Sequence, residues 1–209
     1  MYTTLKKMRI ITILILTLLI SCKEEVKEKN NISDSKKHLV HNELLNADFY
    51  LPNDYKINTI DDFEKELSES RSNIELTKIN FGNIEMLKSL SELTTLYTEK
   101  NKAENYIFFQ KGEYINLNKN IATQYSTMLN NVVEKNWTNF GIDFKLLENK
   151  YLQKNQNKIV KIKYLQEFNK VKKYLTQYLI TAKGKTFSVM VCNFENVDFE
   201  EEFKNIKLK

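Results

Sequence analysis

Five carboxylates flank the strands predicted in the second half of the chain, and they are the first candidates for chemistry: Asp143, Glu148, Glu167, Glu195 and Asp198. Two carboxylates on either side of a bond can act as acid and base, as in glycoside hydrolysis. A serine or cysteine nucleophile usually needs a histidine base, and no histidine follows His41. With 27 acidic residues, neighbouring carboxylates arise by chance. We therefore expect no catalytic residues and no enzyme, with a carboxylate-based hydrolase as the alternative.

Histidine and cysteine are too few for a convincing metal centre. His38 and His41 are three residues apart and could share one helical turn, but two imidazoles without a nearby carboxylate or thiolate make a poor site. Cys192 stands in the apolar segment TFSVMVCNF, where a cysteine is usually a small buried residue. We expect no metal site, no cofactor and no disulfide.

The first 22 residues carry the most specific pattern. Lys6, Lys7 and Arg9 precede an uncharged apolar run, Ile10–Ile20, which is the layout of a secretory signal and is too short to span a bilayer. The run ends Leu19-Ile20-Ser21-Cys22, which resembles the lipobox of bacterial lipoproteins. The resemblance implies that Cys22 is the lipidation site, acylated with palmitate-type chains that hold the protein on a membrane, since two or more chains give a stable anchor.

The residues after Cys22 suggest a destination. Lys23-Glu24-Glu25 is similar to the signal that sends Bacteroidota-type lipoproteins to the outer leaflet of the outer membrane; the alternative is a plain solvated tether. Residues 23–42 hold few large apolar side chains and many charges, which predicts a flexible linker. The expected organisation is a lipoprotein signal peptide over 1–21, a lipidated flexible linker over 22–42 and one domain over 43–209.

Composition excludes several classes of partner. The 209 residues include only four glycines and one proline, so glycine-rich phosphate loops have almost nothing to be built from. Beyond the leader the net charge is only about +2, and only two of the 32 basic residues are arginines, the residues best suited to phosphate and guanine recognition. We expect no nucleic-acid partner.

Hydrophobic periodicity predicts an α+β domain. Strands are expected at 47–52, 105–110, 142–152, 158–168, 171–182 and 185–194, and helices at 60–69, 84–98, 119–136 and after a capping box formed by Asp198 and Glu201. The third helix carries an apolar stripe of Ile121, Tyr125, Met128, Leu129 and Val132. The last strands follow one another through short turns, which indicates an antiparallel meander.

This layout resembles the PsbP/Mog1/DcrB-like fold. The resemblance rests on the early strand with its proline turn (FYLPNDY, 49–55), the helix before the meander and the strand-to-helix finish (NFENVDFEEEF, 193–203). It implies a single domain, a mostly antiparallel sheet packed by helices in an α/β/α sandwich, and a binding or accessory role. If helices cover both faces of the sheet, Val189, Val191 and Cys192 are all buried.

A stripe of tyrosines was the remaining candidate for a binding surface. Tyr151, Tyr164, Tyr174 and Tyr178 lie on neighbouring predicted strands and could form a platform for a sugar or peptide, whereas cross-strand packing is the commoner use of such residues. The leading hypothesis is an envelope lipoprotein of the outer membrane, held by Cys22 and acting as a non-enzymatic binding module with an envelope protein as partner.

Overall fold

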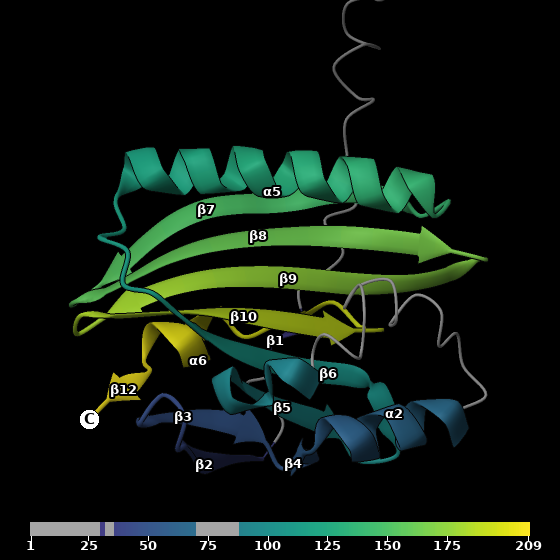
Figure 1. The fold of residues 1–209 in the computed structure, drawn as a ribbon, viewed down its shortest axis with the longest axis horizontal. Coiled ribbons are helices and arrows are strands. Elements are labelled where there is room, and N and C mark those ends of the chain that lie inside the picture. The colour runs from purple at the N-terminus through teal and green to yellow at the C-terminus, as the bar shows by residue number, and fades with distance from the viewer. Residues whose placement is uncertain (1–29, 32–35, 70–87) are drawn as a thin grey trace, which may run out of the picture.

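A computed structural model describes residues 30–31, 36–69 and 88–209. Its main element is a seven-stranded sheet in which every neighbouring pair is antiparallel (Figure 1). The strand order is β4 (Tyr55–Asn58), β5 (Thr94–Glu99), β6 (Lys102–Gly112), β10 (Lys185–Asn193), β9 (Val171–Ala182), β8 (Asn157–Phe168) and β7 (Asp143–Lys154). The predicted meander is therefore confirmed, as four consecutive strands β7 to β10.

The tight turns of the meander are built from residues that tolerate positive φ. The β9–β10 turn places Lys183 at φ 44° and Gly184 at φ 74°, and the β8–β9 turn places Asn169 and Lys170 at 49° and 66°. Two residues with positive φ match the twist of antiparallel strands. These turns set the register Val189↔Tyr178 across β10 and β9.

Both faces of the sheet are covered. Helices α5 (Lys119–Asn139) and α2 (Ile60–Glu69) lie against one face, over β7 and β8 and over β6 respectively (Figure 1). The other face packs against the short helix α6 (Glu200–Lys204) and a second sheet of order β12 (Lys207–Leu208), β3 (Ala47–Pro52), β2 (Lys37–Asn42). A two-residue pair, β1 (Asn30–Asn31) with β11 (Val197–Asp198), is parallel.

The two hydrophobic cores lie on the two sides of the main sheet. Val189 and Val191 are at most 1% exposed in the core with α6 and β3, and Cys192 is fully buried in the core with α5 and α2. The predicted burial of all three residues is thus confirmed. The fold class, a single α+β domain with a mostly antiparallel sheet packed by helices, is confirmed as well.

Two predicted elements need correction. The helix expected over 84–98 fails in its second half: Ser91–Leu93 is a 3₁₀ turn and Thr94–Glu99 is strand β5, while 84–87 lie outside the described residues. Three threonines and a tyrosine favour extended backbone there. Residues 37–42, expected in the linker, form β2 paired with β3, so the ordered part begins earlier than residue 43.

The cap of the last helix also differs. The N-cap of α6 is Phe199, with no side-chain capping bond, and Glu201 pairs with Lys204 instead of completing a capping box. Asp198 accepts a hydrogen bond from the backbone N–H of Glu200 at 3.0 Å, but its main partner is a lysine. Within the described ranges, no helix is both long and apolar enough to cross a membrane.

Candidate functional site: a buried lysine–carboxylate cluster

Three lysines are buried in the main sheet, two on its α6 side and Lys173 on its α5 side. Lys161 and Lys163 alternate along β8, and Lys173 lies on β9; none is more than 1% exposed. The period of two that places Val160, Ile162 and Tyr164 in the α5 core sends Lys161 and Lys163 to the opposite face. Because that face is covered, the lysines need partners inside the protein.

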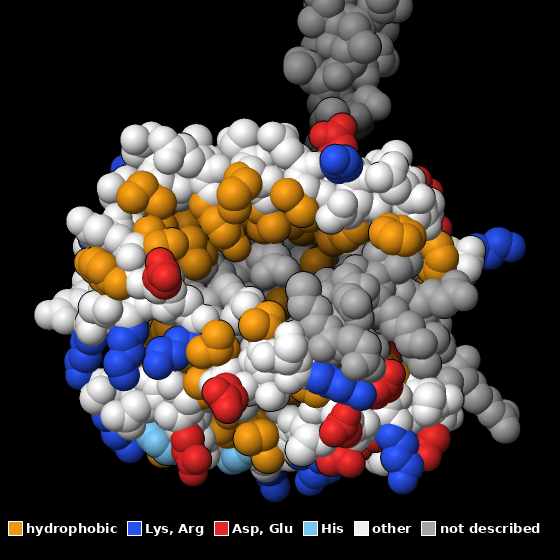
Figure 2. Space-filling model, viewed as in Figure 1, with side chains coloured by type: hydrophobic (Ala, Val, Ile, Leu, Met, Phe, Trp, Pro, Cys, Tyr) orange, Lys and Arg blue, Asp and Glu red, His pale blue; other side chains and the backbone are white. Residues whose placement is uncertain are grey.

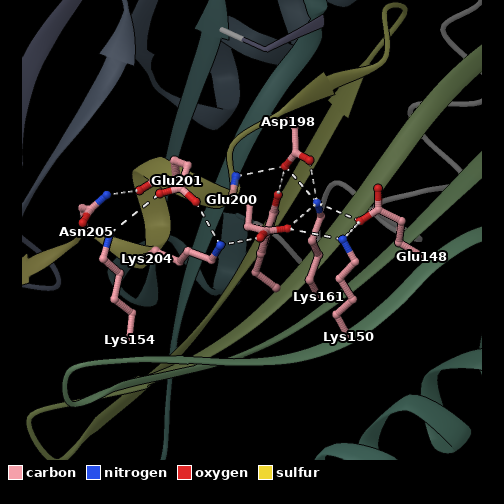
Figure 3. Close-up of polar contacts among 10 residues, drawn as sticks. Glu148, Lys150, Lys154, Lys161, Asp198, Glu200, Glu201, Lys204 and Asn205 are labelled. Atoms are coloured by element: carbon pink, nitrogen blue, oxygen red, sulfur yellow. Dashed lines mark hydrogen bonds and ion pairs between the residues drawn. The ribbon is translucent and has the colours of Figure 1, made fainter. Parts of the chain in front are cut away.

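Lys161 is surrounded by three carboxylates (Figure 3). Its Nζ lies 2.7 Å from Asp198 Oδ2, 3.0 Å from Glu148 Oε2 and 3.0 Å from Glu200 Oε2. Asp198 belongs to β11 and Glu200 begins α6, so the C-terminal segment supplies two of the three charges. The cluster ties this segment to the centre of the sheet.

A β-bulge in β7 supplies the third charge. Leu146 pairs with Tyr164 and Glu148 pairs with Lys163, so Leu147 is an extra residue in the ladder. In a regular ladder without a bulge, Leu147 would pair with Lys163, and Glu148 would lie opposite Ile162 and face the α5 core. A bulge reverses which side chains face each side of a sheet beyond it. The extra residue therefore turns Glu148 toward the lysines.

The electrostatics of the cluster are those of a stable ion network. Burial by itself lowers the pKa of Lys161, but hydrogen bonds and attraction from Asp198, with hydrogen bonds to Glu200 and Glu148, leave its pKa above the ordinary value. Burial raises the pKa of Asp198, and Lys161 more than reverses this, so that the Asp198 pKa is lowered. Lys161 and Asp198 are thus both charged at neutral pH.

The same geometry bears on metal binding. One oxygen from each of Glu148, Asp198 and Glu200 lies within 4.8 Å of the others, a spacing at which three carboxylates could share a cation. The Lys161 ammonium already lies within 3.0 Å of all three. A divalent ion could enter only if this lysine moved out, so the cluster holds an internal cation instead.

The cluster is also a poor environment for a general acid catalyst. An acid catalyst at neutral pH needs a raised carboxyl pKa. The pKa of Asp198 is lowered, and that of Glu200 is lowered too, because Lys204 and Lys161 outweigh the effect of burial. The hydroxyl of Tyr178 contacts Asp198 at 3.4 Å, and burial holds the Tyr178 pKa well above its usual range. The cluster suits positioning of the chain better than proton transfer.

The other two lysines bind backbone carbonyls. Lys163 Nζ donates to the carbonyl of Val197 at 3.0 Å, and Lys173 Nζ donates to that of Glu104 at 3.1 Å and lies 4.5 Å from the centre of the Phe194 ring. Together with the carboxylate cluster, Lys163 holds the segment between β10 and α6 over β8, whereas Lys173 links β9 to β6 on the other face.

The five carboxylates named from the sequence divide into two groups. Glu148 and Asp198 meet at Lys161, as described above. Asp143 and Glu167 are cross-strand partners in β7 and β8, where Glu167 also pairs with Lys172, and Glu195 is exposed. Glu200 and the three buried lysines were missed. The K-x-K alternation in β8, on a strand expected to be covered on both faces, was the available signal.

The tyrosine platform does not form. Tyr164 is buried in the core with α5 and Tyr178 in the core with α6, so the two residues point to opposite sides of the sheet. Both rings pack in the cores: Tyr164 lies 5.2 Å from the ring of Trp137 in α5, and Tyr178 lies 4.9 Å from the ring of Phe203 in α6. Cys22 lies outside the described residues, and its lipidation stays a prediction.

The surface has an open hollow of about 590 Å³ between β4, β5 and α2. Its lining includes Glu43, Asp61 and Glu92, with Lys88 bridging Asp61 and Glu64 at 3.1 and 3.0 Å. The Asp61 side chain is 81% exposed. Charges so well hydrated are ordinary surface groups, so this hollow lacks the buried polar groups that typify a small-molecule site.

Helix α5 presents an apolar ridge to the surface. Its buried residues are Ala122, Ser126, Val133 and Trp137, one step round the helix from the stripe named in the sequence. The α5 ridge, as we call Ile121, Tyr125, Met128, Leu129 and Val132, is only partly covered, with Met128 57% and Val132 48% exposed. Figure 2 shows a band of hydrophobic side chains along this side of the molecule.

Comparisons with known proteins bear on the fold alone. No protein-family model matches the sequence, and no curated protein sequence matches it significantly. The solution structure of cyanobacterial PsbP (CyanoP) from Synechocystis sp. PCC 6803 is similar over 90% of this chain and 98% of its own, with a TM-score of 0.48 and 8% identity. The Ran-binding protein Mog1p of Saccharomyces cerevisiae is similar over 83% of this chain and 96% of its own, with a TM-score of 0.46 and 9% identity.

Proposed function

We propose that the protein is a membrane-anchored envelope lipoprotein whose domain acts as a non-enzymatic binding or accessory module. The observation that carries the proposal is the Lys161 ammonium at the centre of the carboxylate cluster. In the described residues, the carboxylate cluster of Glu148, Asp198 and Glu200 most resembles an active site, and the buried ammonium of Lys161 already pairs with all three acids. What remains for function is the surface of the domain.

The anchor rests on the N-terminal sequence. The basic residues Lys6 to Arg9, the apolar run and Ser21-Cys22 together support acylation of Cys22 and retention at the outer membrane. Eight residue steps separate Cys22 from Asn30, where β1 pairs with β11 of the domain, and an extended chain of that length spans roughly 28 Å. The domain could therefore reach a partner well above the membrane surface.

The α5 ridge supports a protein partner. Met128 and Val132 are 57% and 48% exposed next to the partly buried Ile121, Tyr125 and Leu129, and such neighbouring apolar side chains are typical of an interface core, whereas single exposed apolar residues need no explanation. We propose that an envelope protein packs against this ridge.

A hydrolase remains the alternative, because Glu148 and Asp198 do lie together as a carboxylate pair would. It requires Lys161 to withdraw and expose the acids. A Lys161→Gln variant that gains or loses hydrolysis of a glycoside or ester panel would favour this alternative.

The anchor is tested by labelling and fractionation. Wild-type protein should incorporate labelled palmitate and stay with membranes after a carbonate wash, and Cys22→Ser should lose both properties. Cys192→Ser, which alters the other cysteine of the chain, should retain both properties. Labelling of the Cys22→Ser variant would place the acyl group elsewhere and contradict the proposal.

The ridge is tested by crosslinking in detergent-solubilised envelope. Met128→Glu with Val132→Glu should abolish capture of a discrete partner, because two charges enter the interface. Gln124→Glu with Asn131→Glu adds the same charge on exposed positions of α5 and should leave capture unchanged. Equal capture by both pairs would remove the ridge from the interface.

A further inference from the structure

A second cavity lies at the end of the main sheet where β9 turns into β10. It has a volume of about 260 Å³, and its lining includes Leu44, Leu45, Lys111, Tyr114, Lys185 and Thr186. Two of these residues are cations, three are apolar or aromatic, and none of the lining residues is acidic. The cavity is separate from the Lys161 cluster and from the α5 ridge.

Several cations at this end of the sheet bind neutral oxygens, although Lys154, where β7 turns into β8 at the same end, pairs with Glu201 at 3.8 Å. Lys185 Nζ donates to the carbonyl of Leu45 at 3.0 Å, Lys183 Nζ to that of Leu208 at 2.6 Å, and Lys158 Nζ to Asn116 Oδ1 at 3.3 Å. No described carboxylate lies within 4.0 Å of any of them or of Lys111. Lys56, by contrast, pairs with Glu66 at 2.6 Å.

The charge imbalance is visible on the surface. Lys and Arg side chains gather at the left of Figure 2, the end at which Figure 1 shows the β9–β10 turn. Glu43 and Glu113 adjoin lining residues in the sequence and are exposed, but neither lines the cavity. Lys111 and Lys185 give the cavity lining a positive charge, which attracts anions.

The walls are held in place before any ligand arrives. The loop after β6 is hydrogen-bonded to the ends of β9 and β10. Ile115 N–H donates to Thr186 Oγ1 at 2.9 Å, and Thr181 Oγ1 donates to the Ile115 carbonyl at 3.0 Å. Tyr114, which is 58% exposed, stands on this fastened loop. A preformed cavity loses little affinity to reorganisation.

We propose that this cavity binds a phosphate group carried on a molecule with a short apolar portion. The lysine ammonium groups of Lys111 and Lys185 act as point-charge donors to phosphate oxygens. Leu44, Leu45 and Tyr114 cover the apolar part. The cavity is smaller than a typical drug-sized pocket, which limits the bound part to a headgroup or a small phosphate ester. This inference is independent of the proposed anchor and partner.

The experiment uses the full chain in non-ionic detergent micelles, with ³¹P NMR line broadening as the measure of binding. The probes are inorganic phosphate, glycerol phosphate, and phosphatidylglycerol added to the micelles. Lys111→Gln with Lys185→Gln should weaken binding at least tenfold. Lys145→Gln with Lys172→Gln removes the same charge from exposed positions on β7 and β9, and should change binding less than twofold.

The probes separate the two sources of phosphate. Weakening for all three probes supports a free phosphate ester as ligand, and weakening for phosphatidylglycerol alone supports a lipid headgroup. Equal weakening by the two variant pairs would reduce the effect to overall charge and overturn the proposal, as would absence of binding by the wild type. Thermal melts check folding, and Lys111→Gln alone, which breaks no hydrogen bond, should show a smaller loss in the same direction.

Discussion

Replacing Lys161 with methionine removes the charge at the centre of the cluster and nearly preserves the side-chain length. Lys161 is fully buried, with carboxylate oxygens at 2.7 to 3.0 Å. Removing one side of a buried ion pair costs about 3–5 kcal/mol, because the remaining charges are poorly solvated. We expect a loss of this size in the free energy of unfolding, measured in urea at pH 7.5.

The three carboxylates around Lys161 do not lose the same number of contacts in the Lys161→Met variant. Glu148 keeps Lys150 at 2.9 Å and Glu200 keeps Lys204 at 2.6 Å, whereas Asp198 loses both of its contacts to Lys161, at 2.9 and 2.7 Å. Adding Asp198→Asn to the methionine variant should therefore restore more stability than adding Glu148→Gln. The opposite order would show that the charge balance has been assigned to the wrong residues.

The deficit should also depend on pH. In the wild type the pKa of Asp198 is lowered, so its contribution is present above the ordinary value of 3.8 and is lost as the pH falls through the folded-state pKa. Without Lys161, burial and the neighbouring acids raise that pKa. The folded variant then binds a proton that the unfolded chain does not, and its deficit shrinks between pH 7.5 and pH 5.

A matched control is Lys172→Met, because the Lys172 side chain is 61% exposed and its pair with Glu167 is an ordinary surface pair. It should change stability by less than about 0.5 kcal/mol. A deficit for Lys161→Met below about 1 kcal/mol at pH 7.5, or one that is unchanged at pH 5, would refute the view that buried charge governs this cluster.

Periodicity predicted the strands of the meander well because both of their faces are repetitive, but it missed β2, β4 and β5. In β10 the alternation of Val189 and Val191 with Met190 and Cys192 fixes an extended segment, and Gly184 fixes the turn before it. The same alternation in β8 could not say that Lys161 would be buried. That outcome depends on Asp198, some forty residues away in the chain, and on a single extra residue in β7.

Helix α5 shows a second limit of the sequence pattern. Its most apolar stripe does not take the place nearest the sheet: Ile121, Tyr125 and Leu129 pack only partly against the core, and Met128 and Val132 are exposed. Ala122 and Ser126 take that place, because small side chains let the helix lie close to β7, where Ser126 donates to Asn149 at 2.9 Å. Hydrophobicity predicted the helix, but only the shape of the sheet selects the buried side.

The remaining predictions concern stability, measured in urea and by thermal melts. Val191→Asp places a carboxylate at a position 1% exposed and should cost more than about 3 kcal/mol, whereas Lys172→Asp should fall within about 0.5 kcal/mol of neutral; equal tolerance of the two would mean that the register is wrong. Asn118→Ala removes the bond from the Ile121 N–H at 3.0 Å and should cost about 1 kcal/mol, with Asn118→Ser largely retaining the cap. Deleting residues 1–36 should cost less than about 1 kcal/mol and shift the melting temperature by a few degrees at most, because the two-residue strand β1 is the one described element lost. Deleting residues 1–42 removes β2 as well, which pairs with β3 along six residues, and its hydrogen bonds should amount to about 2–4 kcal/mol. Equal melting temperatures for the two deletions would mean that β2 adds nothing to the domain and that the boundary at residue 43 was right; a difference of several degrees places the start of the folded domain at β2.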